Sequence, residues 1–490
     1  MRLRPMIVAL MLAAGPALAG PPDSLVLGMQ LEPPNLDPTA GAAGAIDEVV
    51  YANLFEGLTR FREDGSIAPG LAESWEVSED GRSYTFHLRD GVRFHDGTAF
   101  DAGDVVFSLD RARGPDSTNA QKALFDGIEA VTALDPGTVR VDLGAPDSGF
   151  LWALAWGDAV ILAPETADAA ATAPVGTGPF RFDRWVRGDR VELARNDAYW
   201  GAPVALDRAV FRFISDPTAA YAALLAGDID AFPNVPAPET LMQFKADPHF
   251  QVTVGLTEGE TILAINNARP PLDDIRVRRA IAHAIDRQAL IDGALYGYGT
   301  PIGSHFAPHH PAYVDLTGLS AYDPDAARSL LAEAGFADGL RLTLTLPPPA
   351  YARRGGEIVA AQLRAVGIDA RIEAVEWAQW LERVFRGHDY DLTIVSHTEP
   401  HDIGIYARPD YYFGYDNPEM GALMARLRAA PDTAGRNAIL AEAQAIIARD
   451  QVNAFLFQLA RTGVADARLR GLWANAPVQA NDLTGVYWAE

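Results

Sequence analysis

Titratable side chains gather in one short segment near the end of the chain. Residues 391–396 are predicted as a strand, and the sequence continues as HTEPHD. In an open parallel sheet, ligands bind beyond the carboxyl ends of the strands. The acids of this loop would attract a cationic group, and its imidazoles would add polar contacts. We therefore predict ligand binding at His397, Glu399, His401 and Asp402.

Positive charge follows a neighbouring strand end. Residues 340–346 alternate as a strand, and the chain continues through three prolines into a helix that begins with Tyr351, Arg353 and Arg354. Free backbone N–H groups, the positive end of the helix dipole and two arginines together favour an anion. One edge of the sheet would then present both signs of charge, as a zwitterion such as a short peptide requires.

Simpler roles for these groups are open as well. The arginines could be solvated residues of a first helical turn, and Glu399 or Asp402 could cap the turn that follows. Three more residues complete the predicted ligand site: Gln30 follows the first predicted strand, and Tyr406 and Arg408 belong to an aromatic cluster that could also be surface packing. Tyr199, Trp200 and Trp75 are expected to be core framework.

Metal binding and hydrolysis are the competing chemistries. The histidines and acids of the HTEPHD loop have spacings that suit a divalent ion, and His305, His309 and His310 form a second cluster. Without cysteine, a tight site would need three or four converging imidazoles or carboxylates, so we expect neither a metal nor a cofactor. The chain contains neither G-x-S-x-G nor H-E-x-x-H, and we expect no enzymatic activity.

Alternating strand and helix patterns position this chemistry. Between the two strands named above, residues 357–366 have one apolar helical face, 368–372 alternate as a strand, and 377–385 have amphipathic helical spacing. This β-α-β-α-β order predicts parallel strands with right-handed crossovers. Earlier in the chain, residues 25–29 are predicted as a strand and 46–58 as a helix.

Shorter strands are predicted between Trp75 and Phe94. Asp-Gly at residues 90–91 between alternating runs is a hairpin signal, and so is the turn that contains Gly81. The Pro/Gly-rich segment 174–179 marks a boundary, and a second one follows at 266–271.

Composition limits the partners. The 490 residues carry a formal net charge of -25 and no cysteine. Nucleic acid and anionic membrane surfaces are therefore poor partners, and disulfides, Cys-zinc sites and thiol nucleophiles are excluded. Nearly half the residues are hydrophobic, which is typical of a well-cored globular protein of two to four folding units.

The first twenty residues predict export. A basic start, the apolar run MIVALMLAA and the sequence ALAG have the order of a secretory leader that is cleaved after Ala19. No later apolar run approaches the roughly 20 residues that a membrane-spanning helix needs. We expect a soluble periplasmic protein without a direct membrane anchor.

Several segments, in order, resemble one family. They are residues 68–77, 84–89, 94–97, 102–108, 175–180, 196–200, 225–230 and 277–287, which include LAESWEV, TFHLR, FHDG, GTGPF and VRRAIAHAIDR. The sequence is similar in these segments to the bacterial extracellular solute-binding proteins of ABC importers, in the family that binds peptides, nickel chelates and opines. The resemblance spans nearly the whole chain after the leader.

The resemblance implies an α/β fold of two lobes hinged around a ligand cleft, with mixed, mainly parallel sheets. Lobe I would comprise residues 20–47, 175–263 and 475–490, an inserted third domain 48–174, and lobe II 264–474. Peptide binders of the family place an acid after the strand that here is 391–396, where it holds the ligand ammonium. Either Glu399 or Asp402 occupies that position, whereas Ser396-His397 replaces the usual Gly-Trp pair.

The expected function is that of a monomeric periplasmic receptor that captures a small zwitterionic solute, in the first place a di- or oligopeptide, and delivers it to inner-membrane permease subunits. An opine, a glycoside, a nickel chelate or a directly bound metal remains the alternative.

Overall fold

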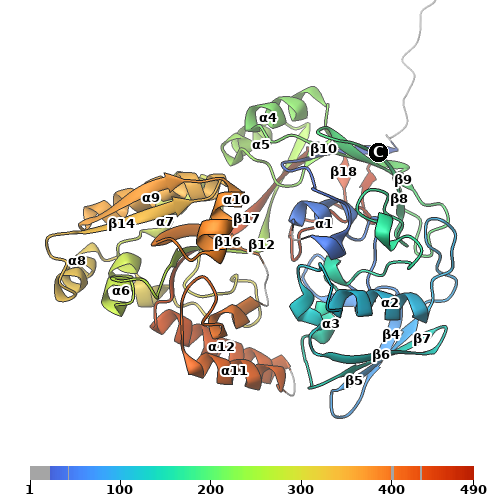
Figure 1. Ribbon diagram of the computed structural model, residues 1–490. Helices are drawn as coiled ribbons and strands as arrows, with labels where there is room; N and C mark the ends of the chain where they lie inside the picture. The colour runs from blue at the N-terminus through green and yellow to red at the C-terminus, as the bar shows by residue number, and fades with distance from the viewer. Residues whose placement is uncertain (1–22, 42, 399–401, 431–432) are drawn as a thin grey trace, which may run out of the picture.

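The computed structural model describes residues 23–41, 43–398, 402–430 and 433–490. Its centre is one eleven-stranded sheet that joins segments from both ends of the chain (Figure 1). Along the sheet the order is β15 (Ile368–Ala374), β14 (Leu340–Leu346), β16 (Leu392–His397), β12 (Phe250–Ile265), β17 (Asn453–Asp466), β11 (Ala231–Phe232), β1 (Ser24–Met29), β10 (Arg208–Phe213), β9 (Arg190–Arg195) and β8 (Phe180–Val186), with β13 (Gly299–Pro301) paired to β17.

Two long strands connect the two ends of this sheet. β12 and β17 are antiparallel; β11 pairs with one end of β17, and β16 pairs with the far end of β12. The register between the two long strands shifts between Leu256 and Glu260. Irregular pairing of this kind bends a strand, so the ladder is weakest where the two parts of the molecule meet. We call the part built on β14, β15 and β16 lobe II, and the part built on β1 and β8–β11 lobe I.

The sheet is mixed, as predicted. β14 pairs in parallel with β15 and β16, and β1 pairs in parallel with β10 and β11. The long strands make the centre antiparallel, and β8–β9–β10 is antiparallel too. Parallel pairing therefore belongs to the crossover units of each lobe rather than to the sheet as a whole.

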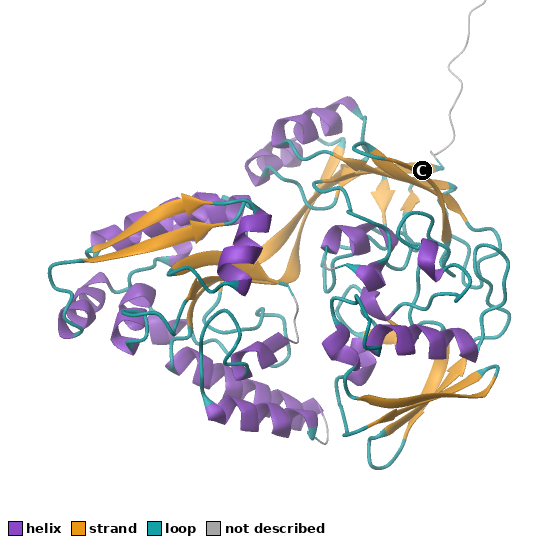
Figure 2. Cartoon of the chain, in the orientation of Figure 1, coloured by secondary structure: helices purple, strands orange, loops and turns teal. Residues whose placement is uncertain are grey.

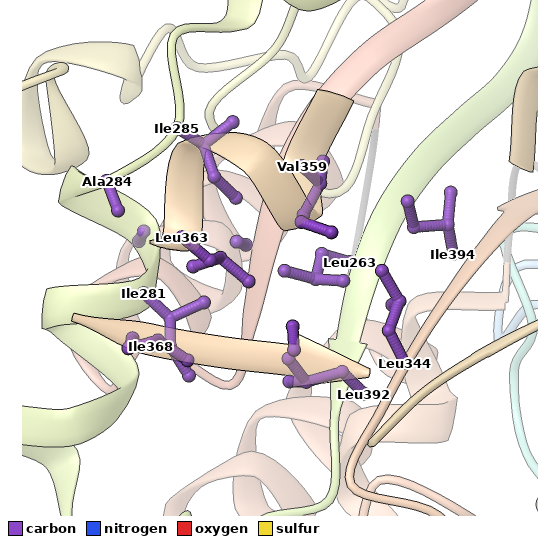
Figure 3. Packing of buried hydrophobic residues seen from close by; sticks show 14 of the residues in the cluster. Leu263, Ile281, Ala284, Ile285, Leu344, Val359, Leu363, Ile368, Leu392 and Ile394 are labelled. Atoms are coloured by element: carbon purple, nitrogen blue, oxygen red, sulfur yellow. The ribbon is translucent and has the colours of Figure 1, made fainter. Parts of the chain in front are cut away.

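Lobe II contains the predicted β-α-β-α-β unit. The helix between β14 and β15 is α9 (Ala350–Ala365), which begins earlier than predicted, and α10 (Trp377–Trp380) continues as a π-helical turn at Leu381–Arg386. Figure 3 shows Leu344, Ile368 and Leu392 of the strands packed against Val359 and Leu363 of α9. Alternation places these strand residues on one face, and all five are fully buried.

Helices cover both faces of lobe II (Figure 2). Besides α9, one face packs against α6 (Ile275–His283), α7 (Arg287–Leu295) and α8 (Pro324–Glu333). The other packs against α11 (Pro418–Arg428), α12 (Thr433–Arg449) and a cluster of buried aromatic rings. A strand covered on both faces has no polar side, and residues 392–395 of β16 are all buried.

A smaller antiparallel sheet stands beside lobe I. Its order is β4 (Ala72–Val77), β5 (Ser83–Leu88), β7 (Thr138–Leu143) and β6 (Ile128–Asp135), and α2 (Ala102–Arg113) packs on it. The predicted hairpin between β4 and β5 is confirmed. Further elements are β2 (Thr59–Phe61), β3 (Ile67–Pro69), α3 (Phe150–Ala153), α4 (Pro217–Ala226), α5 (Leu241–Ala246), β18 (Leu469–Arg470) and β19 (Tyr487–Trp488).

The helix predicted over residues 46–58 is wrong in its second half. α1 covers only Gly44–Val50, and the next residues turn away with Ala52 at φ 56°. The buried Asn53 amide donates to the carbonyls of Val49 and Asn481, and the Asn53 carbonyl accepts from Phe180. Bonds to distant segments replace the helical ladder, so tertiary contacts override the apolar spacing.

Within residues 23–41, 43–398, 402–430 and 433–490, the helices fall short of the length and apolar character that crossing a bilayer requires. The predicted leader, residues 1–19, lies outside the described residues, and its cleavage stays a prediction.

Candidate functional site

A pocket lies where lobe I, the smaller sheet's domain and lobe II meet. Its wall is lined by Gly41, Gly44, Asp47, Ala120, Gln121, Trp156, Asp158, Thr398 and Gln479. Thr398 directly follows β16 of lobe II, whereas Gly44 and Asp47 belong to α1. We call this space the interlobe pocket. It lies at the carboxyl end of a strand, where the sequence predicted ligand binding.

Direct contacts bridge the lobes, one of them at the pocket. The Gln479 amide donates to Thr398 Oγ1 at 3.3 Å. Arg436 of α12 donates to Ser148 Oγ at 3.3 Å, and Arg354 of α9 lies 3.4 Å from Glu239, which precedes α5. These contacts join segments that are far apart in sequence and link the two lobes.

Asp402 is the predicted acid that the structure describes, and it is surrounded by histidines. Its Oδ1 lies 2.9 Å from Nε2 of His305, and its Oδ2 lies 3.3 Å from Nδ1 of His397. The other nitrogen of His305 lies 2.6 Å from Oε1 of Glu260. The four residues come from β12, the segment after β13, the end of β16 and the 3-10 turn Asp402–Ala407.

The charges of this cluster are set by burial and by one another. His305 has no exposed surface and Glu260 is 3% exposed. Burial favours neutral imidazole, but the carboxylates of Glu260 and Asp402 prevail and raise the pKa of His305. Burial would raise the pKa of Asp402, yet the facing His305 imidazolium lowers it well below its usual range. Asp402 is therefore an anion and His305 a cation at neutral pH.

Glu260 is different, because burial prevails there and raises its pKa in spite of His305. Coulombic repulsion from Asp402 acts in the same direction. The cluster thus holds one imidazolium between two carboxyl groups, of which Asp402 takes the negative charge more readily. Asp402 keeps 18% of its side chain exposed.

Aromatic rings enclose the cluster. Tyr406 is buried, meets the His305 ring edge-on at 5.3 Å and accepts a hydrogen bond from Asn453. His397 stacks on Tyr412, whose hydroxyl lies 3.1 Å from His397 Nε2. The predicted aromatic cluster is thus mostly core, and the Tyr412 hydroxyl contacts a histidine of the charge cluster.

The predicted anion-binding residues have protein partners. Arg353 lies 3.2 Å from Glu376 and also donates to the Val375 carbonyl, and Arg354 pairs with Glu239. The Tyr351 hydroxyl accepts from the Ser396 amide, and burial raises its pKa to about 12. An anionic ligand group would have to compete with carboxylates for either arginine.

The remaining predicted residues lie apart from the cluster. Gln30 donates to the Asn234 carbonyl in lobe I. Arg408 is exposed, stands over the Tyr411 ring and lies 3.9 Å from Asp410. Glu399 and His401 lie outside the described residues. These placements do not test contact with a ligand, so ligand binding by each of the ten predicted residues stays a prediction.

Sequence reasoning did not select Glu260 as a site residue, and it grouped His305 with His309 and His310 rather than with Asp402. His309 lies 2.6 Å from Glu258, and His310 stacks on Phe306, so the three neighbouring histidines do not converge. The donor atoms of Glu260, His305 and Asp402 lie within 4.8 Å of one another. No spacing rule could have found a group drawn from residues 260, 305 and 402.

The sequence and the fold are similar to those of known proteins. The model for bacterial extracellular solute-binding proteins of family 5 matches residues 66–415. The chain belongs to this family. The dipeptide-binding protein of Escherichia coli K12 is 32% identical over 398 residues, covering 74% of each chain. The glutathione-binding protein of Salmonella typhi is 32% identical over 376 residues, covering 75% of this chain and 72% of the relative.

Solved structures agree in fold. The ABC transporter-associated periplasmic binding protein of Helicobacter pylori in complex with the peptide STSA has a TM-score of 0.85 at 26% identity, covering 95% of this chain and 98% of the other. A binding protein of A. tumefaciens R10 in complex with agropinic acid has a TM-score of 0.82 at 25% identity, with 95% and 100% covered. The chain is thus a solute-binding protein of an ABC importer, a non-enzymatic transport receptor.

Proposed function

We propose that this family 5 receptor is exported to the periplasm and captures a small zwitterionic solute, a di- or oligopeptide, in the interlobe pocket. It then delivers the solute to inner-membrane permease subunits. The single observation that carries the proposal is a pocket whose walls come from α1 of lobe I and from Thr398, the residue after β16 of lobe II.

The relatives support a peptide in particular. The E. coli relative is a dipeptide-binding protein, and the H. pylori structure contains the peptide STSA. Lobe closure around a ligand is a common mode of such receptors. The interrupted register between β12 and β17 supplies a hinge, and the contact of Gln479 with Thr398 is of the kind that closure would form. The predicted lobe limits of 20–47, 175–263 and 475–490 against 264–474 belong to this proposal.

Asp402 would hold the ligand ammonium. It is an anion, part of its side chain is exposed, and it lies four residues after the pocket residue Thr398. Its two histidine partners fix the carboxylate in place, and a fixed charge binds a cation without the entropic cost of ordering a free side chain. Arg353 and Arg354 lie after β14 on the same lobe, where a ligand carboxylate could displace Glu376 or Glu239.

Calorimetry on protein freed of co-purified ligand tests the proposal. The probes are Ala-Ala and Ser-Thr-Ser-Ala. Ligand binding also raises the unfolding temperature in a concentration-dependent way, which provides a second measurement. D402N should weaken dipeptide binding at least about thirtyfold, which corresponds to the loss of a buried charge pair. D410N is the matched control, since Asp410 lies nearby with 84% of its side chain exposed. Equal affinities for D402N and D410N would contradict the role of Asp402.

The same calorimetric experiment also tests two other classes of ligand. Structures of similar fold contain Ni(L-His) and agropinic acid, at 25% identity each. The donor atoms of Glu260, His305 and Asp402 lie within 4.8 Å of one another, so a metal complex is the second candidate, provided that its binding displaces the proton from His305. Micromolar binding of Ni(L-His) with no response to either peptide would replace the peptide proposal.

Export is tested separately. N-terminal sequencing of periplasmic material should start at Gly20.

A further inference from the structure

Lobe I contains a second pocket, and its lining residues differ from those of the interlobe pocket. Its volume is about 100 Å³, and β12, β17 and the segment 469–474 form most of its wall. The register of the β12–β17 ladder shifts further along the same strands, after Leu256. We call this second space the hinge pocket. The described residues of the predicted ligand site do not line it, so the proposed function gives it no role.

The floor of the hinge pocket is hollow because small side chains form part of it. Gln251 and Thr253 of β12 line the pocket together with Ala465 and Gly463, their register partners on β17. Directly opposed residues of an antiparallel pair place their side chains on the same face of the sheet. Gly463 has no side chain, and that of Ala465 is a single methyl group. The Gln251 amide donates to the Leu469 carbonyl, which ties this floor to the segment above it.

Apolar groups and hydrogen-bond donors share the wall, as is usual in sites for small molecules. The segment 469–474 contributes the Leu472 side chain and the indole of Trp473, both of which are partly buried. Within the part of the chain that the structure describes, the Trp473 N–H and the Thr253 hydroxyl have no hydrogen-bond partner. Both groups are therefore available to an acceptor atom of a guest.

The charge on this wall is positive. Arg470 lines the pocket, and neither Asp nor Glu is among its described lining residues. Nη1 of Arg470 donates to the carbonyls of Ala467 and Leu469 at 2.6 and 2.8 Å, which fixes the position of the guanidinium. Its Nε and Nη2 have no partner among the described residues, and an arginine presents such N–H groups in a geometry that suits a carboxylate.

The acids nearest in the chain or in contact with this segment have other partners. Asp466 lies 2.8 Å from Arg468. Glu63 accepts a hydrogen bond of 2.6 Å from the backbone N–H of Ala474. In a chain whose formal net charge is -25, a wall with an arginine and without a lining acid favours an anionic guest over a cationic one.

We infer that the hinge pocket binds a small amphipathic carboxylate, whose anionic group contacts Arg470, Trp473 and Thr253 and whose apolar part lies against Leu472 and the floor. The inference goes beyond the proposed function, because the transported solute is bound in the interlobe pocket. A cavity of roughly 150 Å³ holds one benzene molecule. The hinge pocket is therefore large enough for a short-chain carboxylate such as butyrate.

Butyrate and butyramide are matched probes, because they have nearly the same shape and differ in charge. The measurement is fluorine NMR of the mature chain labelled with 5-fluorotryptophan, and W473F identifies the Trp473 resonance among those of the nine tryptophans. Butyrate should shift this resonance to saturation and bind at least about fivefold more tightly than butyramide, because its contact with the guanidinium is charge-assisted. Absence of a saturable shift at about 50 mM butyrate, well above a millimolar Kd, would refute the site.

R470Q tests the charge of the guest. It should abolish the preference for butyrate and leave the affinity for butyramide within about threefold of the parent value. R328Q is the matched control, because Arg328 is also exposed and pairs with Asp325 in α8 of lobe II. It removes the same charge from the chain and should leave the preference intact. An unchanged preference in R470Q would overturn the assignment of a carboxylate guest.

T253L tests the location by filling the pocket from its floor. It should weaken the binding of both probes at least about tenfold. V254L enlarges the neighbouring side chain, which lies on the other face of β12 and is 47% exposed, and it should leave both affinities unchanged. Unchanged butyrate binding by T253L would overturn the inference. If urea unfolding shows that T253L is destabilised, R470Q decides the outcome, because Arg470 is exposed and its replacement leaves the core intact.

Discussion

Replacement of His305 by asparagine should destabilise the protein by about 3–5 kcal/mol at neutral pH, the usual cost of breaking a buried charge pair. The imidazole has no exposed surface, and its two nitrogens lie 2.6 Å from Glu260 and 2.9 Å from Asp402. Asparagine fills part of the space but carries no charge, so H305N leaves two buried carboxyl groups facing each other.

The magnitude follows from opposing contributions. At these separations the attraction between unit charges is about 6 kcal/mol per pair for an effective dielectric constant of about 20. Removing each ion from water costs several kcal/mol, so the intact cluster adds little net stability. Once His305 is gone, the desolvation cost of Asp402 remains without the attraction that offset it. Part of the loss is recovered when the carboxyl groups take up protons, and this limits the effect to a few kcal/mol.

Urea unfolding of ligand-free protein provides the measurement. H249N is the matched control, because His249 lies 2.7 Å from Asp247 but has 85% of its side chain exposed. It should not measurably change the midpoint. The double variant E260Q/H305N should be more stable than H305N by at least about 1 kcal/mol, because one uncompensated carboxyl group is replaced by a neutral amide. E260Q alone should destabilise the parent.

The decisive result is the effect of E260Q on the free energy of unfolding, which E260Q should lower in the parent and raise in H305N. A role for His305 in packing alone would make the two substitutions additive, with E260Q destabilising in both backgrounds. If H305N unfolds at the same urea concentration as H249N, or if E260Q lowers the stability of H305N further, the charge cluster does not exist in solution as described.

Further predictions concern the core, the lobe contact and the acids of the pocket. L344A should cost about 2–5 kcal/mol in urea unfolding, since Leu344 is fully buried between β14 and α9, and a loss below about 1 kcal/mol would contradict that packing. R354A should weaken ligand binding by no more than about fivefold and only at low salt, because the ion pair between Arg354 and Glu239 is partly exposed. An equal loss of affinity at high salt would mean that Arg354 contacts the ligand. The ligand-free protein should gain stability as pH falls from about 7 toward 5, because the folded-state pKa of Asp47 lies above its unfolded value near 3.9 and the folded state binds the additional proton in that window. D47N should flatten this slope in thermal unfolding, and an unchanged slope would mean that other groups cause it.

Local periodicity was sufficient to predict the elements of lobe II. Alternation over 340–346 and helical spacing over 357–366 are properties of short segments, and the structure confirms β14, α9, β15 and β16 in parallel pairing. Local periodicity failed at residues 51–58, where Asn53 and Leu54 bond to Phe180 and Gly178 instead of continuing a helix. Gly178 can approach this closely because it has no side chain; a Cβ atom at this position would collide with the Asn53 carbonyl.

Residues expected to be framework also depend on distant partners. The indole of Trp200 and the hydroxyl of Tyr199 both donate to the buried carboxylate of Glu56, and Thr177 is a third donor. Tyr199 and Trp200 were expected to be core framework, and both are partly buried. The sequence could not predict that their polar atoms hold a carboxylate from a segment more than a hundred residues away.

The sequence by itself determined the family, the strand and helix pattern of lobe II, the strongly negative charge and the strand end near which the interlobe pocket lies. Those features depend on short-range periodicity, composition and ordered motifs. The tertiary structure decided which acids are compensated: Asp402 meets His305 and His397, whereas Oδ1 of Asp47 is buried without a hydrogen-bond partner among the described residues. The physical reason is that the charge of a buried group depends on the few ångströms around it, and folding fills that space from segments that have no fixed spacing in the chain.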